Sequence, residues 1–259
     1  MGKIIGVFNQ KGGVAKTTTT SNLGSAIAMK GNKVLMVDLD PQANCTNALG
    51  VDDETLEQSI YDLLISQKKV KKEGILEITK KTSFNVDLLP SDISLADAEQ
   101  TLSNVISRET VLKKLLDQVR DDYDYILLDC PPSLGLLSIN ALAASDYIII
   151  PVYPSYFSVK GIKHLLKTYT LVKDNLNQKL DIMGIVLTKF DQRINKHKEI
   201  KGDLEKLQVF ENKVFKTVIR VNSELEYAQD EQKPITFYNT NCNGYIDYTN
   251  LADEVLSHD

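Results

Sequence analysis

Residues 9–20, NQKGGVAKTTTT, determine how the rest of this chain is interpreted. They follow a short apolar run, KIIGVF (3–8), and begin a segment in which Leu23 and Ile27 fall on one helical face. In a strand, glycine-rich turn and helix of this order, backbone N–H groups converge on phosphate oxygens and the helix N-terminus adds its positive end. The sequence therefore predicts a phosphate-binding loop.

The loop residues have separate expected tasks. The glycines Gly12 and Gly13 let the backbone approach the phosphates, Lys16 reaches the β- and γ-phosphates, and Thr17 ligates Mg²⁺. ATP and Mg²⁺ are thus the expected cofactors. The alternative interpretation is a glycine-rich turn with an exposed lysine.

Ala15 stands where phosphate loops usually carry glycine. If Gly13 is left-handed, the alternation of a phosphate-cradling nest makes residue 15 left-handed as well. A residue with a Cβ is destabilised there by about 1–2 kcal/mol, or at most about tenfold in affinity if only the bound loop is strained. We expect a working site, which Ala15→Gly would tighten modestly without changing the fold.

Three carboxylates follow other predicted strands. Asp38 and Asp40 lie at the end of the strand predicted within VLMVDLDPQAN (34–44), and Asp129 ends YDYILLD (123–129). Ligands of open α/β sheets bind at the carboxyl ends of the strands. There these groups can hold the water shell of a metal and orient an attacking water, although each could also cap its own loop.

Short apolar runs alternate with segments of helical period, which is typical of a largely parallel sheet. Strands are expected at 3–8, 33–38, 84–90, 123–129, 146–152 and 180–188, and helices at 16–30, 55–66, 94–119, 158–176, 196–208 and 244–257. Because no linker or internal repeat interrupts the pattern, we predict one α/β domain over residues 1–259. Its mostly parallel, twisted sheet is flanked by helices on both faces.

Composition excludes several classes of protein. No apolar stretch approaches the length that spans a bilayer and no signal peptide begins the chain, so a cytoplasmic protein is expected. Cys45, Cys130 and Cys242 lie far apart without CxxC spacing, so neither a disulfide framework nor a zinc site is expected. The net charge of −5 argues against nucleic-acid binding by the whole surface.

One segment is locally basic. Residues 189–220 hold nine lysines and arginines against five acidic residues, a net charge of +4. Such a segment is usually a solvated helical face, and contact with DNA phosphates is the alternative.

Five stretches together resemble the deviant Walker A ATPases, which are SIMIBI-class P-loop NTPases of the MinD/ParA superfamily, and within them the ParA/Soj partition proteins. They are NQKGGVAKTTTT, VLMVDLDPQAN, DYILLDCPPSLGLLSINALAASDYIIIPV, GIVLTKFDQR and KPITFYNTNCNGYIDYTNLADEV. The resemblance covers nearly the whole chain except residues 50–110. It implies a P-loop NTPase fold.

The resemblance also implies roles for individual residues. Lys11 would reach across a two-fold interface to the phosphates bound by the other subunit, and Asp40 would orient the attacking water with help from Asp38. Asp129 would close the metal site and couple residues 130–135 to the nucleotide state. The implied catalytic residues are Lys11, Lys16, Asp38 and Asp40, and the implied nucleotide-binding residues are Lys11, Gly12, Gly13, Val14, Ala15, Lys16, Thr17, Thr18 and Asp129.

The implied partners are a second copy of the chain, double-stranded DNA bound without sequence preference, and a ParB-like centromere-binding protein that stimulates slow hydrolysis. Membrane binding is not implied, and the ATP-bound form would associate with the nucleoid. The expected DNA contacts are Lys189, Arg193, Lys196 and Arg220. No N-terminal extension with helix-turn-helix character precedes the phosphate loop, so no operator binding is expected.

Three other functions occur on the same fold. A MinD-like cell-division ATPase needs a basic amphipathic terminal helix, whereas this chain ends in the acidic YTNLADEVLSHD. A carrier like the nitrogenase iron protein needs two cysteines at the dimer axis, and only Cys130 has a suitable context. A dethiobiotin-synthetase-like enzyme fits DPQAN and the C-terminal stretch less well.

Overall fold

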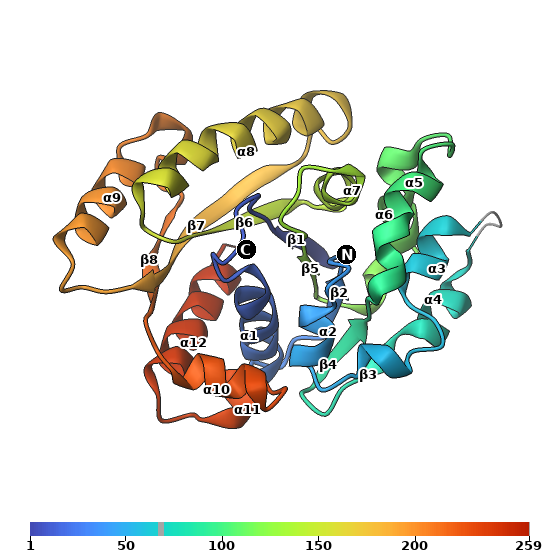
Figure 1. The fold of residues 1–259 in the computed structure, drawn as a ribbon, viewed down its shortest axis with the longest axis horizontal. Coiled ribbons are helices and arrows are strands. Elements are labelled where there is room, and N and C mark those ends of the chain that lie inside the picture. The colour runs from blue at the N-terminus through green and yellow to red at the C-terminus, as the bar shows by residue number, and fades with distance from the viewer. Residues whose placement is uncertain (67–69, 259) are drawn as a thin grey trace.

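The computed structural model describes residues 1–66 and 70–258, and it describes residues 156–160 by their backbone alone. Eight strands form one sheet in the order β3-β4-β2-β5-β1-β6-β7-β8 (Figure 1). Neighbouring strands are parallel except for β3 and β4. The strands are β1 (Lys3–Val7), β2 (Val34–Asp38), β3 (Lys80–Lys81), β4 (Val86–Leu89), β5 (Tyr125–Asp129), β6 (Tyr147–Val152), β7 (Asp181–Phe190) and β8 (Val214–Arg220).

Helices cover both faces of the sheet, as the sequence predicted (Figure 1). One face carries α1 (Lys16–Met29), α2 (Asn44–Ala48), α10 (Glu224–Asp230), α11 (Ile235–Tyr238) and α12 (Asn243–Leu256). The other carries α3 (Ile60–Ile65), α4 (Lys72–Ile78), α5 (Ala98–Leu102), α6 (Val111–Leu116), α7 (Leu136–Ala144), α8 (Tyr156–Asn175) and α9 (Asn195–Glu205). Short 3₁₀ turns lie at Asp53–Thr55, Ile93–Asp97, Arg108–Thr110, Arg120–Asp122 and Gln208–Phe210.

Burial explains why the central strands read as continuous apolar runs. Every residue of β2 and β5 is buried, because helices pack on both faces of these strands. A separate hydrophobic core lies on each side of the sheet, with Ile4 and Leu35 in one and Ile5 and Met36 in the other. The predicted α/β class is confirmed.

One predicted helix differs from the structure, and one edge strand was not predicted. The helix expected over 94–119 is two helices, α5 and α6, separated by a turn in which Ser107 has a left-handed φ of 58°. The strand β8 was not predicted, since it pairs only with β7 at the sheet edge and several of its side chains are half-exposed, which blurs its apolar pattern.

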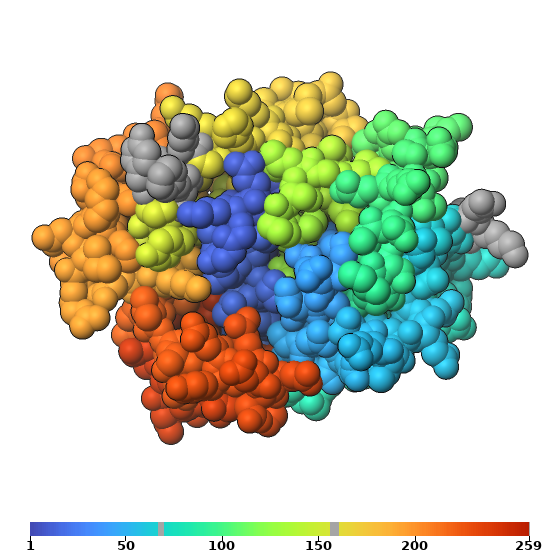
Figure 2. All heavy atoms as spheres, viewed as in Figure 1, coloured from blue at the N-terminus to red at the C-terminus, as the bar shows by residue number. Residues whose placement is uncertain are grey.

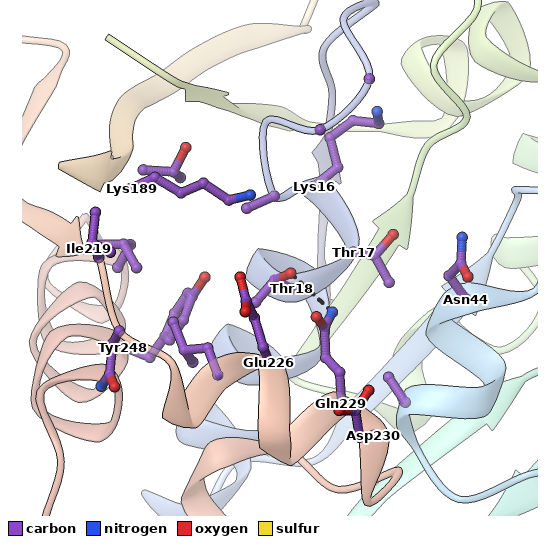
Figure 3. Close-up of a pocket in the computed structure, with 18 of the residues that line it drawn as sticks. Lys16, Thr17, Thr18, Asn44, Lys189, Ile219, Glu226, Gln229, Asp230 and Tyr248 are labelled. Carbon is purple, nitrogen blue, oxygen red and sulfur yellow. Dashed lines mark hydrogen bonds between the residues drawn. The ribbon is translucent and has the colours of Figure 1, made fainter.

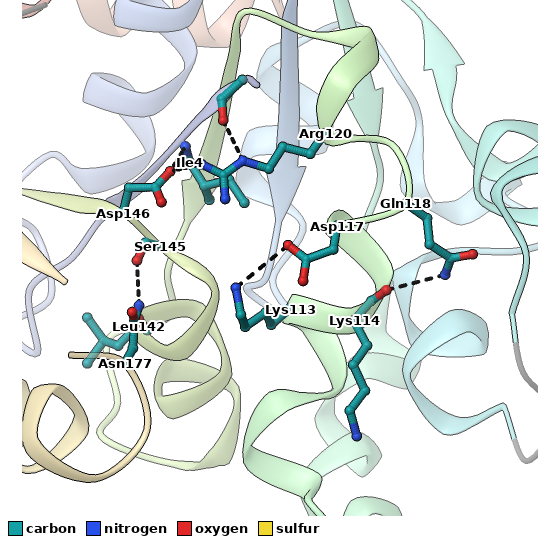
Figure 4. Close-up of polar contacts among 11 residues, drawn as sticks. Ile4, Lys113, Lys114, Asp117, Gln118, Arg120, Leu142, Ser145, Asp146 and Asn177 are labelled. Atoms are coloured by element: carbon teal, nitrogen blue, oxygen red, sulfur yellow. Dashed lines mark hydrogen bonds and ion pairs between the residues drawn. The ribbon is translucent and has the colours of Figure 1, made fainter. Parts of the chain in front are cut away.

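The edge of the sheet where β1 begins is closed by a partly buried polar network (Figure 4). Asp146 accepts hydrogen bonds from the Ile4 N–H at 2.8 Å and from the guanidinium of Arg120. The Arg120 Nε also donates to the Gly2 carbonyl at 2.6 Å. This network ties β1, β5 and β6 together at the edge opposite the phosphate loop.

Within residues 1–66 and 70–258, no helix is both long enough and apolar enough to cross a bilayer.

Candidate nucleotide-binding site

The phosphate loop leaves the carboxyl end of β1 and enters α1 through two left-handed residues. Gly13 has φ 72°, and Ala15, at the N-cap of α1, has φ 64° and ψ 39°. The alternation expected from the sequence is therefore confirmed, with a Cβ-bearing residue in the second left-handed position. Two left-handed residues around Val14 turn successive N–H groups toward one point, as an anion-binding nest requires.

Hydrogen bonds to other strands hold the loop in this shape. Asn9 accepts the Lys11 N–H at 3.0 Å and donates to the Pro151 carbonyl of β6 at 2.8 Å. Thr188, in β7, donates its hydroxyl to the Val14 carbonyl at 3.1 Å. The loop is consequently preorganised by strands that lie far from it in the sequence.

The space in front of the loop fits a bound anion. A Cβ placed on Gly12 or Gly13 would meet no atom within 4 Å, so neither glycine is needed for packing inside the chain. A cavity of about 670 Å³ opens there, a size that suits a nucleotide. Lys16, Thr17, Thr18 and Asp40 line the cavity on the side of the loop (Figure 3).

Asp129 meets the loop at the carboxyl edge of the sheet, as predicted. It pairs in register with Val7 of β1 and with Asp38 of β2. Its two carboxylate oxygens accept the hydroxyls of Thr17 at 2.7 Å and of Thr20 at 3.0 Å. Because Thr17 donates its proton to Asp129, the hydroxyl oxygen keeps a lone pair for a cation.

Asp38 and Asp40 are not equivalent. Asp40 lines the cavity, whereas Asp38 is fully buried behind it and does not, in the described residues, reach the cavity wall. Asp38 accepts the Asp40 N–H at 3.1 Å and both the N–H and the hydroxyl of Thr46 at 2.8 Å. Asp38 thus orients the segment that presents Asp40 to the cavity.

Burial, and to a smaller extent a neighbouring carboxylate, raises the pKa of both buried carboxyls. The pKa of Asp38 is raised to about 8 by burial and then by the charge of Asp129. The pKa of Asp129 is raised to about 6, mainly by burial, against the hydroxyls of Thr17 and Thr20. Burial lowers the pKa of Lys16, opposed by the charge of Asp129.

These shifts predict a stability that depends on pH. A carboxyl whose pKa is higher in the folded chain binds more protons there, so the stabilisation is complete below about pH 4 and is lost as pH rises toward 8. We expect the nucleotide-free chain to lose on the order of 1–3 kcal/mol of unfolding free energy between pH 5 and pH 8. Urea denaturation at each pH measures this loss.

Asp129→Asn should flatten that dependence, because it removes the charge that opposes ionisation of Asp38. Thr20 can accept from the new amide, since its own hydroxyl can donate to the Lys16 carbonyl at 3.1 Å. Asp203→Asn, on the exposed surface of α9, is the matched control. If the unfolding free energy of Asp129→Asn depends on pH as steeply as that of the wild type, the pH dependence does not come from Asp38 and Asp129.

Lys11 lies on the loop but points away from the cavity of its own chain. Its ammonium donates to the Ser155 hydroxyl at 3.3 Å and lies 5.9 Å from the centroid of the Tyr153 ring. Among the described residues that line the cavity, Lys16 is present and Lys11 is not. The two loop lysines therefore face different surroundings.

The far wall of the cavity was not found from the sequence. It includes Thr188 and Lys189 at the end of β7, residues 219–223 at the end of β8 and just after it, Glu226, Gln229 and Asp230 of α10, and Tyr248 of α12 (Figure 3). Topology brings these residues to the loop, and no local motif marks them. Gln229 donates to the Thr18 hydroxyl at 3.0 Å, which joins α10 to the first turn of α1.

The expected DNA contacts fall into two groups. The side chain of Arg193 is 90% exposed and pairs with Asp191, and Lys196 of α9 pairs with Glu199 on the same exposed surface. Lys189 and Arg220 instead line the nucleotide cavity. Arg220 also forms a two-pronged pair with the buried Asp247, at 2.6 and 3.0 Å.

The conformation of Ala15 changes the result expected for Ala15→Gly. The left-handed backbone is held by contacts within the folded chain, among them the Thr188 hydroxyl on the Val14 carbonyl, so its strain belongs to the fold. Glycine removes about 1 kcal/mol of strain but adds a similar entropy to the unfolded chain. We expect less than about a twofold change in ATP affinity by calorimetry. A tenfold gain would mean that the loop rearranges when ATP binds.

Comparisons with known proteins agree with this geometry. A family described as an AAA domain matches residues 2–182. The chain is 46% identical over 259 residues to sporulation initiation inhibitor protein Soj of Bacillus subtilis, covering 100% of both chains. It is 35% identical over 260 residues to chromosome partitioning protein ParA of Caulobacter vibrioides, covering 99% of this chain and 95% of that one.

A solved structure of a nucleotide-binding protein has a similar fold. Cobyrinic acid a,c-diamide synthase of Mycobacterium smegmatis, with bound ATP analogue and magnesium, has a TM-score of 0.82 and 32% identity to this chain. The match covers 100% of this chain and 96% of that chain.

Proposed function

Because this chain belongs to the Soj/ParA family of chromosome-partitioning ATPases, we propose that ATP converts it from a monomer into a homodimer that binds double-stranded DNA without sequence preference. A ParB-like centromere-binding partner stimulates the slow hydrolysis that returns the dimer to monomers. Residues 1–259 act as one ATPase domain, and the ATP-bound form associates with the nucleoid.

The chain is an ATPase whose cofactors are ATP and Mg²⁺. In the proposed arrangement the N–H groups of residues 12–18 bind the phosphates, the ammonium of Lys16 binds the β- and γ-phosphates, and the hydroxyl of Thr17 holds the metal. Bound Mg²⁺ neutralises charge on the phosphate oxygens. The open space in front of Gly12 and Gly13 supports this placement.

The carboxylates divide the hydrolytic work. Asp40 lines the cavity and is assigned the orientation of the attacking water. Asp38 accepts the N–H of Asp40 and is assigned the positioning of that residue. Asp129 accepts the Thr17 hydroxyl, and the chain that follows it, residues 130–135, leads directly into α7. This connection supports a switch that senses the metal site through Thr17.

The position of Lys11 is the main observation that supports the proposed dimer. Its ammonium lies beside Ser155 and Tyr153 and outside the cavity of its own chain. A second copy with bound ATP would offer it the γ-phosphate, a stronger partner than a hydroxyl. Dimerisation would then depend on the nucleotide.

The wall formed by β8 and α10 is assigned to the nucleoside of ATP. Residues 219–223, Glu226, Gln229 and Asp230 of α10, and Tyr248 line this part of the cavity. This wall mixes apolar side chains with carboxylates and an amide, which suits a base and a ribose.

Arg193 and Lys196 are assigned to the DNA surface because the side chains of both are exposed. Exposed pairs of this kind contribute little to stability, so DNA phosphates can replace them. Lys189 and Arg220 remain predicted contacts, although both line the cavity. Charge reversal at Arg220 would also leave Asp247 buried beside a second acid.

The experiment that tests this surface combines Arg193→Glu and Lys196→Glu. With ATP and Mg²⁺, we expect affinity for duplexes of any sequence to fall by at least on the order of tenfold, with a shallower salt dependence. Lys114→Glu, which makes the charge change of one of these two substitutions on the exposed surface of α6, is the control, and it is compared with each single variant (Figure 4). If the double variant and the wild type bind DNA with equal affinity, this segment is a solvated helical face and not a DNA-binding surface.

A further inference from the structure

His197 is a polar side chain buried beneath the surface of α9, where it is only 5% exposed. Its Nδ1 accepts the Asp191 N–H at 3.1 Å. An imidazole nitrogen that accepts a hydrogen bond carries no proton, so the proton of the neutral ring lies on Nε2. His197 therefore fixes the turn that joins β7 to α9.

Arg193, which is assigned to the DNA surface, is held in the same turn. The Asp191 carboxylate accepts the N–H of Arg193 at 2.9 Å and two donors of its guanidinium at 3.0 and 2.8 Å. Because His197 holds the N–H of Asp191 and Asp191 holds Arg193, the three residues form one connected unit. A movement of the His197 ring would therefore change where Arg193 is presented to DNA.

The His197 ring packs edge to face against Tyr153, which follows β6, at 5.7 Å between centroids. The Tyr153 ring in turn lies 5.9 Å from the ammonium of Lys11. Figure 2 shows the yellow-green surface of the segment around residue 150 between the blue surface of the N-terminal segment and the orange surface of α9. Tyr153 is thus the contact between the lysine of the phosphate loop and the buried histidine of α9.

Open space beside these rings allows them to move. A second cavity, of about 410 Å³, is lined by Gly13 of the phosphate loop and by Tyr153, Asp191 and His197. Close packing normally holds buried rings in place, but a ring that borders a cavity can turn without displacing packed neighbours. A change at Lys11 can therefore reorient Tyr153 and, through it, His197.

We propose that His197 is a positioning residue that couples Lys11 of the phosphate loop to Arg193 of the DNA surface. When the Lys11 ammonium leaves the Tyr153 ring for a phosphate bound by a second copy, that ring loses a cation–π contact and changes its orientation. The His197 ring moves with it and carries Arg193 to the position in which the dimer binds DNA. The inference rests on the proposed function for the dimer and for the DNA, whereas the contacts that support it lie within one chain.

The first measurement uses the full chain without nucleotide or DNA. Lys11→Ala removes the ammonium beside Tyr153, and hydrogen exchange of the amides of residues 191–199 should change by on the order of twofold or more. Tyr153→Phe, which keeps the ring, should preserve this response to Lys11→Ala, whereas Tyr153→Leu should abolish it. Lys30→Ala removes a lysine that pairs with Asp253 of α12 and should leave the same amides unchanged.

Two further substitutions separate the two contacts of the imidazole. His197→Asn keeps an oxygen that can accept the Asp191 N–H but lacks the ring, and His197→Phe keeps a ring but lacks the acceptor. Each breaks the connection, so neither variant should show the response to Lys11→Ala. With ATP and Mg²⁺, both should bind ATP and dimerise as the wild type does, yet bind DNA at least about fivefold more weakly.

A purely structural role for His197 would not produce this pattern, because substitutions that only loosen α9 would leave the response to Lys11→Ala in place. Persistence of the response in either His197 variant would therefore overturn the proposal. Its absence in the wild-type background, its appearance in Lys30→Ala, or wild-type DNA affinity in both His197 variants would overturn the proposal as well. If the His197 variants do not fold, the comparison of Tyr153→Phe with Tyr153→Leu decides the same question. A wild type that fails to dimerise with ATP would contradict the proposed function without altering the response measured in the nucleotide-free chain.

Discussion

Asp40→Asn is expected to bind ATP as the wild type does and to lose at least about a hundredfold in turnover, because the orientation and polarisation of water by a carboxylate are removed. The side-chain oxygen of Asp40 accepts the Gln42 N–H at 3.0 Å, and the asparagine oxygen can still accept it. The fold of the segment is thus retained. Phosphate release at saturating ATP measures the loss, and calorimetry measures ATP binding.

Asp53→Asn, after α2, is a control for loss of a carboxylate outside the cavity. Asp40→Ala should match Asp40→Asn in turnover, since neither side chain carries the charge. If Asp40→Asn hydrolyses ATP at the normal rate, Asp40 is not the water-orienting group. The assignment would then pass to Asp38, which accepts the Asp40 N–H.

Lys11→Ala is expected to bind ATP but to lose the ATP-dependent dimer. Removing one partner of a desolvated charge pair costs about 3 kcal/mol, which is more than a hundredfold in dimer affinity. The variant should therefore also fail to bind DNA. Light scattering with ATP and Mg²⁺, over a range of protein concentrations, measures the dimer.

Ser155→Ala is the matched control, because it removes one hydrogen bond of Lys11 within its own chain and leaves the ammonium in place. We expect this variant to dimerise at least as well as the wild type. A Lys11→Ala protein that still forms the dimer with wild-type affinity would contradict the contact between subunits.

The phosphate loop could be predicted from the sequence because its geometry is set locally. Glycine and alanine at 13 and 15, next to a strand and a helix, were sufficient to predict two left-handed residues, and the structure has both. The carboxylates could be placed at the same edge because each ends an apolar strand of a parallel sheet. The individual surroundings of these carboxylates could not be predicted from the sequence, since the burial of Asp38 depends on Thr46 and on packing across the sheet.

The remaining parts of the site depend on contacts distant in sequence. The wall around Glu226 and Gln229 is brought to the loop by the order of the strands and has no motif of its own. Helix α7 is apolar nearly all round because it is buried, so its sequence lacks the one-sided period by which helices are predicted. The family resemblance implied a DNA contact at Arg220, and only the structure places Asp247 beside it.

DNA binding by the wild-type chain in three nucleotide states tests ATP-gated dimerisation most directly. Fluorescence anisotropy would be recorded with two duplexes of unrelated sequence, in the presence of ATP with Mg²⁺, ADP with Mg²⁺, or no nucleotide. We predict similar binding to both duplexes with ATP and little binding in the other two states. Equal binding in all three states, or none with ATP, would contradict the proposed function.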